Sequence, residues 1–185
     1  VMTYTAYDGK TARLCVATST DLLKWEKRGL AFKKPEYRDL WSKSGAIVCA
    51  RTGDRISARK INGKYWMYWG DTDIFLATST DLINWQPVKG KKGKLASALQ
   101  PRPGFFDSQL VEPGPLALLT PKGILLIYNS ANNHETGDST LAHMSYSAGQ
   151  ALFNAEHPDE LIARASRPTQ RSISTASCAT QASTA

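Results

Sequence analysis

The sequence predicts an all-β protein built from small sheets that pack radially, as in a β-propeller. The main observation is a repeat: residues 17–25 read ATSTDLLKW and residues 77–85 read ATSTDLINW, which match at seven of nine positions. An offset of 60 residues is too long for most helical solenoids, but it suits a four-stranded propeller blade with an insertion. In addition, no segment shows the apolar spacing of an amphipathic helix of about ten residues, which argues against an α/β protein.

Each repeat unit is predicted to be a meander, in which antiparallel strands are joined by tight turns. The pairs Asp8-Gly9 and Asn62-Gly63 supply the positive φ that two-residue hairpins need. A third turn is predicted at residues 121–123, and residues 145–153 (SYSAGQALF) are interpreted as a degenerate third copy of the repeat. The predicted strands cover residues 1–7, 12–19, 55–61, 65–69, 74–79, 115–119, 124–128 and 141–147.

Asp21 and Asp81 recur at the same place in two units, directly after a predicted strand. A carboxylate at such a position can accept backbone N–H hydrogen bonds in the turn, so a structural role is favoured over catalysis. Trp25 and Trp85 end the two copies of the repeat. We expect both indoles to pack between neighbouring blades.

The repeat length also limits how much of a propeller the chain can hold. Units of 60 to 68 residues give fewer than three complete blades in 185 residues, whereas propellers close with typically about 4–8 blades. Residues 1–164 are therefore predicted to form a partial propeller, and the natural protein is expected to be longer at both ends. Ser, Thr and Ala make up two thirds of residues 165–185, which predicts a disordered tail or an out-of-frame reading.

Composition excludes several classes of partner. The net charge is +7, and four lysines lie in one Gly-punctuated stretch at residues 89–94. No zinc-finger spacing or basic helix accompanies them, so a solvated loop is favoured over a nucleic-acid surface. No window approaches the roughly 18 apolar residues of a membrane helix. Cys15, Cys49 and Cys178 form neither a disulfide framework nor a metal motif, and the first two are predicted to be buried thiols.

The segment at residues 105–115 (FFDSQLVEPGP) is the first candidate for chemistry, because it is not repeated and combines acids, aromatics and prolines. Glu112 precedes Pro113, which holds it extended. A loop that enters a blade lies at the mouth of the central channel, so Glu112 is predicted to be a functional carboxylate rather than a turn residue. Function and structure are evenly balanced for Asp107.

Two further clusters have the composition of a sugar site. Trp69 ends the aromatic run YWMYW, and Asp71 and Asp73 follow it. Aromatic rings stack on pyranose rings and carboxylates bind hydroxyls or move protons, although a tight turn would also explain two aspartates. Tyr128 and Asn129 open a polar loop whose amides and hydroxyls could bind sugar hydroxyls. No nucleophilic triad and no Gly-rich phosphate loop is visible.

Four motifs, in order, resemble glycoside hydrolase family 130: residues 1–25, residues 62–85 (NGKYWMYWG followed by IFLATSTDLINW), residues 106–115 (FDSQLVEPGP) and residues 123–129 (GILLIYN). The resemblance covers about residues 1–164. It implies a five-bladed β-propeller, of which this chain would hold about three blades. It also implies activity on β-mannosides, because the family comprises β-mannoside phosphorylases and β-mannosidases.

The resemblance further implies which branch of the family is the better match. The proton-donating Asp of the phosphorylases lies in a segment that would precede Val1. Their phosphate contacts include a His after the Tyr that matches Tyr128 and an Arg where this chain has Trp69-Gly70, whereas here Asn129 follows Tyr128. These departures favour the hydrolases, which are thought to use a pair of carboxylates.

The sequence therefore predicts an inverting β-1,2-mannosidase that acts on a β-mannoside oligosaccharide without metal or cofactor, nucleic acid or membrane. Glu112 and Asp71 would be the catalytic acid and base, with their carboxyl groups roughly 6.5–9.5 Å apart. The alternatives are a β-mannoside phosphorylase that releases mannose 1-phosphate and a sugar-binding propeller without catalysis. The residues predicted to bind the sugar are Asp107, Asp73, Trp69, Tyr128 and Asn129.

Overall fold

The protein is described by a computed structural model over residues 1–90 and 93–171, and its architecture is all-β, as predicted. A short 3-10 helix, η1, spans Pro35–Tyr37. The strands are β1 (Met2–Tyr7), β2 (Ala12–Thr18), β3 (Glu26–Leu30), β4 (Gly45–Thr52), β5 (Arg55–Ala58), β6 (Lys60–Ile61), β7 (Lys64–Trp69), β8 (Ile74–Ser79), β9 (Trp85–Pro87), β10 (Ser97–Leu99), β11 (Leu110–Pro113), β12 (Ala117–Thr120), β13 (Gly123–Ala131), β14 (Tyr146–Phe153), β15 (Leu161–Arg164) and β16 (Gln170–Arg171).

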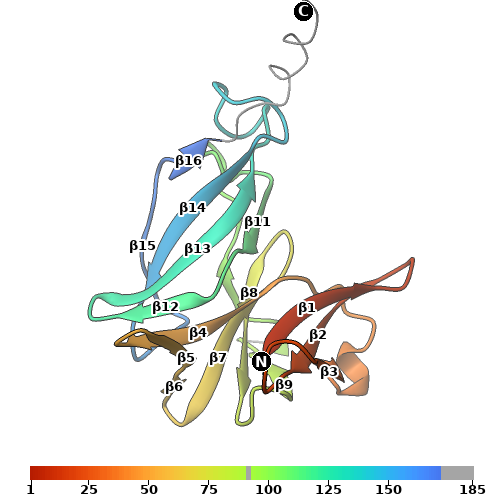
Figure 1. The fold of residues 1–185 in the computed structure, drawn as a ribbon. Helices are drawn as coiled ribbons and strands as arrows, with labels where there is room; N and C mark the ends of the chain where they lie inside the picture. Colours follow the sequence, from red (N-terminus) through yellow and green to blue (C-terminus); the bar gives the residue numbers. More distant parts are fainter. Residues whose placement is uncertain (91–92, 172–185) are drawn as a thin grey trace, which may run out of the picture.

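The strands form three successive meanders along the chain (Figure 1). The first sheet has the order β1-β2-β3, and the second is built on β4, β7 and β8, with β9 and β10 both paired to β8. In the third, β13 pairs with β11, β12 and β14, and β14 pairs with β15 and β16. A parallel pairing of β4 with β12 joins the second and third sheets.

The repeated sequence forms the same turn twice. Asp21 Oδ1 accepts the backbone N–H groups of Leu23 and Lys24, and Asp81 Oδ1 accepts those of Ile83 and Asn84. The predicted structural role of both aspartates is therefore confirmed. By this equivalence β1 corresponds to β7, which has β4 on its other side, whereas no strand of the described residues pairs with the other side of β1.

The two repeat tryptophans differ. Trp85 is 0% exposed and lies between the first and second sheets, with its backbone N–H donated to Ala31 O at 2.9 Å, so its predicted packing role is confirmed. Trp25 is 38% exposed. The expectation that Trp25 is covered is wrong for this chain, because none of its described sheets lies against that face.

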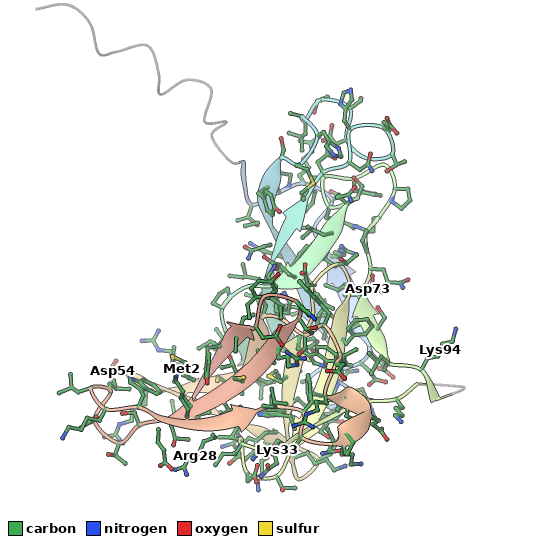
Figure 2. All side chains as sticks on the ribbon, turned by 90° about the vertical axis from the view of Figure 1, so that its right-hand side faces the viewer. Met2, Arg28, Lys33, Asp54, Asp73 and Lys94 are labelled. Atoms are coloured by element: carbon green, nitrogen blue, oxygen red, sulfur yellow. The ribbon has the colours of Figure 1, made fainter. Side chains whose placement is uncertain are left out.

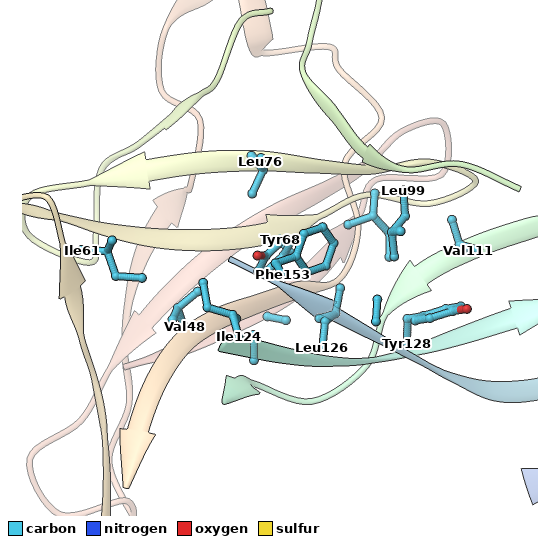
Figure 3. Close-up of a cluster of buried hydrophobic side chains, with 14 of the residues drawn as sticks. Val48, Ile61, Tyr68, Leu76, Leu99, Val111, Ile124, Leu126, Tyr128 and Phe153 are labelled. Carbon is cyan, nitrogen blue, oxygen red and sulfur yellow. The ribbon is translucent and has the colours of Figure 1, made fainter. Parts of the chain in front are cut away.

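A second apolar core fills the space between the second and third sheets (Figure 3). The rings of Tyr68 and Phe153 meet there, with centroids 4.7 Å apart. Tyr128 lies opposite Gly149 in the β13–β14 ladder. A Cβ added at Gly149 would come within 2.2 Å of Tyr128 Cζ, so this close approach requires glycine.

Three element predictions need correction. The strand predicted at residues 141–147 is wrong, because the chain turns there and the strand is β14. The third repeat copy is also wrong: Gly149 stands where the repeat has Asp, so no carboxylate is present to hold a turn and β14 runs straight through. The strand predicted at residues 55–61 is split at Arg59, since β5 pairs with β4 and β6 pairs with β7.

Backbone pairing extends a few residues past the predicted boundary at residue 164. Thr169 donates its backbone N–H to Ala148 O at 2.8 Å, and β16 pairs with β14. The rest of the predicted tail, including Cys178, lies outside the described residues, as do Lys91 and Lys92. Lys94 lies on a loop that projects from the body of the protein (Figure 2). Cys15 and Cys49 are buried, and burial raises the pKa of both thiols.

Candidate active site

The two predicted catalytic carboxylates meet at one lysine. Asp71 lies on the turn between β7 and β8, and Glu112 lies in β11. Lys43, which precedes β4, places its Nζ 3.3 Å from Asp71 Oδ2 and 3.1 Å from Glu112 Oε2. The two oxygens can therefore be no farther apart than about 6.4 Å, the sum of these distances. Both carboxylate side chains are partly accessible, at 18% and 15% exposure.

Backbone contacts bring the three segments together. The N–H of Val111 donates to Thr72 O at 3.0 Å, which joins the Asp71 turn to β11. The N–H of Gly70 donates to Lys43 O at 2.9 Å, which joins the same turn to the segment before β4. Gly70 has a φ of 139°, and a Cβ there would lie 2.1 Å from Asp73 O. The turn that presents Asp71 therefore requires glycine at this position.

Two neutral groups complete the cluster. Trp41 Nε1 donates to Asp71 Oδ2 at 3.0 Å, and Asn129 Nδ2 donates to Glu112 Oε1 at 3.4 Å. Asn129 stands directly opposite Glu112 in the β11–β13 ladder. We call these five residues, Lys43, Asp71, Glu112, Trp41 and Asn129, the Lys43 cluster.

The electrostatics of the Lys43 cluster favour an ammonium ion at its centre. Burial disfavours the charged form of Lys43, but the Glu112 and Asp71 carboxylates outweigh this effect, so the pKa of Lys43 is raised above its usual value. Two carboxylates and one ammonium leave a surplus of negative charge. Such a cluster can bind the hydroxyl groups of a neutral ligand, and its carboxylates can transfer protons to or from that ligand.

The other predicted sugar-binding residues lie elsewhere. Asp73 Oδ2 accepts a hydrogen bond from Gln100 Nε2 at 3.0 Å and faces the segment of β10 rather than Lys43. Trp69, Asp107 and Tyr128 are fully buried. The structure therefore supports no sugar contact for these three side chains.

Asp107 instead anchors a buried network. Arg102 donates to it through Nε and Nη2 at 3.1 and 2.8 Å, and Tyr128 Oη donates to its Oδ2 at 2.7 Å. Arg164 Nη2 lies 2.7 Å from the same oxygen. Burial is the main cause that raises the pKa of Tyr128 to about 12. This network connects β13 and β15 to the loop before β11, so the contacts of Asp107 are structural.

Sequence reasoning missed Lys43 and Trp41. Neither lies in a repeat or a recognisable motif, and their contacts with Asp71 span 28 and 30 residues. The one local feature that could have indicated them is the segment at residues 41–44 (WSKS), in which an aromatic residue and a lysine alternate with serines ahead of an apolar run. In the structure these side chains alternate: Ser42 is buried against the first sheet, whereas Trp41 and Lys43 both donate hydrogen bonds to Asp71.

Comparison with known proteins decides the family. A model of glycoside hydrolase family 130, described as β-1,4-mannooligosaccharide phosphorylase, matches residues 1–169. The chain belongs to glycoside hydrolase family 130. Members of family 130 are five-bladed propellers, and this chain is part of one, as predicted.

The family 130 relatives include both phosphorylases and hydrolases. A 1,2-β-oligomannan phosphorylase of Thermoanaerobacter sp. (strain X514) is 31% identical over 157 residues, which are 84% of this chain and 43% of the relative. A second relative is a solved structure that is 44% identical, has a TM-score of 0.90 and covers 93% of this chain. It is described with the words "The GH130 family of mannoside phosphorylases contains glycoside hydrolases that target beta-1,2 mannosidic linkages in Candida mannan". The β-1,2-mannobiose phosphorylase of Listeria innocua, in complex with β-1,2-mannobiose, is 25% identical, with a TM-score of 0.66, and covers 90% of this chain.

The chain spans about half the length of these relatives, 49% of the hydrolase-related structure and 40% of the Listeria enzyme. Within the described residues of this family 130 chain, no three His, Cys, Asp or Glu side chains come together in a way that could hold a metal ion. Among the described residues the one helix is η1, which is too short to cross a membrane.

Proposed function

We propose that the complete protein hydrolyses β-1,2-linked mannosides, with Asp71 and Glu112 as its working carboxylates. The observation that carries the proposal is the convergence of these two side chains on Lys43, from segments that are about 40 residues apart in the sequence. In an inverting reaction, one carboxylic acid protonates the leaving oxygen and the other carboxylate activates water on the opposite face of the sugar.

The separation of the pair adds a condition to this mechanism. Inverting enzymes hold their carboxyl groups roughly 6.5–9.5 Å apart, so that a water molecule fits between the general base and the sugar. The oxygens that face Lys43 are at most about 6.4 Å apart, at the lower edge of that range, and the Lys43 ammonium lies between them. We therefore propose that the contact of Lys43 with one carboxylate opens when substrate and water enter.

The charge of the Lys43 cluster supports hydrolysis over phosphorolysis. Phosphate brings negative charge, and the one ammonium of the cluster is already in contact with both acidic side chains. The similarity values point the same way, since the hydrolase-related structure is the better match at 44% identity against 25%. The alternative, a β-mannoside phosphorylase, is supported by the phosphorylases among the relatives.

The test is incubation of the full-length protein with β-1,2-mannobiose, with and without inorganic phosphate. β-1,4-Mannobiose serves as the linkage control. We expect mannose at an equal rate in both conditions, with the α-anomer as the first product by proton NMR, as inversion requires. Mannose 1-phosphate formed strictly with phosphate would establish the phosphorylase instead. Binding of mannobiose without turnover would leave a sugar-binding propeller.

A further inference from the structure

The aromatic residue that the sequence predicted to stack on the sugar is not accessible in the structure. Trp69, the predicted stacking residue, is fully buried and packs between Phe32 and Phe75. A pyranose ring cannot reach its faces. Trp41, by contrast, is 48% exposed, and its indole N–H is held by the Asp71 carboxylate.

We propose that Trp41 is the platform on which a mannose ring of the substrate stacks. This inference rests on the proposed function, because it assigns the neutral pyranose of the mannoside as the ligand. The apolar face of a pyranose, with its C–H groups, suits an aromatic face, while its hydroxyls suit the carboxylates and amide beside it. The Lys43 cluster supplies both kinds of group within one partly exposed site.

The exposed indole is held in place from three sides. Its Nε1 donates to Asp71 Oδ2 at 3.0 Å. The ring of Tyr7 meets it edge-on, with centroids 6.3 Å apart and an interplanar angle of 67°. The neighbouring Ser42 is buried, donates its backbone N–H to Ala12 O and accepts the N–H of Leu14 at its Oγ, both at 2.9 Å.

About half of the Trp41 side chain stays exposed although its orientation is fixed, so packing accounts for only part of the arrangement. A platform explains it, because a ring that is ordered before binding loses less conformational entropy when the sugar arrives. Asp71 then acts twice: it orients the platform and belongs to the proposed catalytic pair. The mannose ring that stacks on Trp41 is therefore held next to the reacting carboxylates.

The test measures binding of β-1,2-mannobiose by the full-length protein through calorimetry and intrinsic tryptophan fluorescence. Trp41→Leu keeps an apolar side chain but removes the aromatic face, and we expect it to weaken binding about three- to tenfold with an unchanged melting temperature. Trp41→Phe keeps an aromatic face and is expected to retain most of the affinity. Trp66→Phe changes an indole on β7 that lies outside the Lys43 cluster and is partly covered by the core between the second and third sheets. It serves as the control, which should bind normally and still show the fluorescence change.

Three outcomes separate this inference from the proposed function. Mannobiose that binds without turnover, and less tightly in Trp41→Leu, would support the platform and contradict hydrolysis. Turnover with unchanged binding by Trp41→Leu, or a fluorescence change that survives it, would overturn the platform and leave hydrolysis standing. A wild-type protein that binds no mannoside would contradict both.

Discussion

At the scale of single residues, the site depends on how one ammonium ion is shared. Lys43 contacts Asp71 and Glu112 together, so a change at any of the three alters the electrostatic surroundings of the other two. Asn129 and Trp41 hold the outer sides of the carboxylates with neutral N–H donors. Removing the charge of one carboxylate should therefore change chemistry more than it changes folding.

Glu112→Gln in the full-length protein is the direct test of that expectation. The amide keeps the shape of the side chain and its place opposite Asn129, so the thermal stability should stay close to that of the wild type. Loss of general acid–base help is worth typically about 10²–10⁴-fold in rate, and we expect a fall of this size in kcat on β-1,2-mannobiose. A fall of less than about tenfold at unchanged stability would remove Glu112 from the catalytic pair.

At the scale of elements, the turns and hairpins could be predicted from the sequence because their residues are close together in the chain. The hairpins at Asp8-Gly9 and Asn62-Gly63 were predictable because the turn residues and the flanking alternation agree. The Asp21 and Asp81 turns were predictable because the sequence repeats them. The site was half predictable: composition indicated Glu112 and Asp71, but their meeting at Lys43 depends on long-range pairing such as Thr72 with Val111, which no local pattern encodes.

The stability that the repeated Asp81 turn contributes should depend on pH. The N–H of Asn84 is the main cause that holds the pKa of Asp81 well below its usual range, with further donors from its side chain and from Ile83. A lowered folded-state pKa stabilises the protein above the unfolded-state value, about 3.9, and this contribution is lost as the pH falls below it. In the full-length protein, we expect Asp81→Ala to lower the melting temperature at pH 7, and the difference from wild type to shrink as the pH approaches 3. A difference that stays constant down to pH 3 would contradict the role of the charge.

Trp85 is the element-scale test of sheet packing. It is fully buried between the first and second sheets, in contact with the cluster that includes Leu14, Phe32 and Ala77. In the full-length protein, Trp85→Ala leaves a large cavity and should lower the free energy of unfolding by about 3–5 kcal/mol, measured by urea denaturation. Asp54→Ala, on the exposed turn between β4 and β5, is the surface variant and should cost less. A cost for Trp85→Ala below that of the surface variant would show that the two sheets do not depend on this contact.

At the scale of the whole molecule, the internal repeat shows what covers each sheet. Trp85 and Leu82 of the second sheet pack against the first sheet. Their counterparts in the first sheet, Trp25 and Leu22, are exposed, and Leu23 beside them is 86% exposed. The relatives are about twice as long as this chain, and they form a five-bladed ring. The exposed copy of the repeat is thus the place where a further sheet would pack.

The 185-residue chain on its own should therefore neither behave as a stable monomer nor hydrolyse mannosides. One edge of β1 has no partner strand among the described residues, and the exposed apolar side chains at residues 22–25 lie on the same sheet. Unpaired edges and apolar patches favour association between chains, so we expect early elution in size-exclusion chromatography with light scattering and a broad, non-cooperative melt by circular dichroism. The double substitution Leu22→Lys and Leu23→Lys should reduce the association without restoring activity, because the charges block the contact but supply none of the missing sheets. A monodisperse wild-type monomer with a cooperative melt and measurable release of mannose from β-1,2-mannobiose would contradict this expectation, and would show that the Lys43 cluster is sufficient for catalysis.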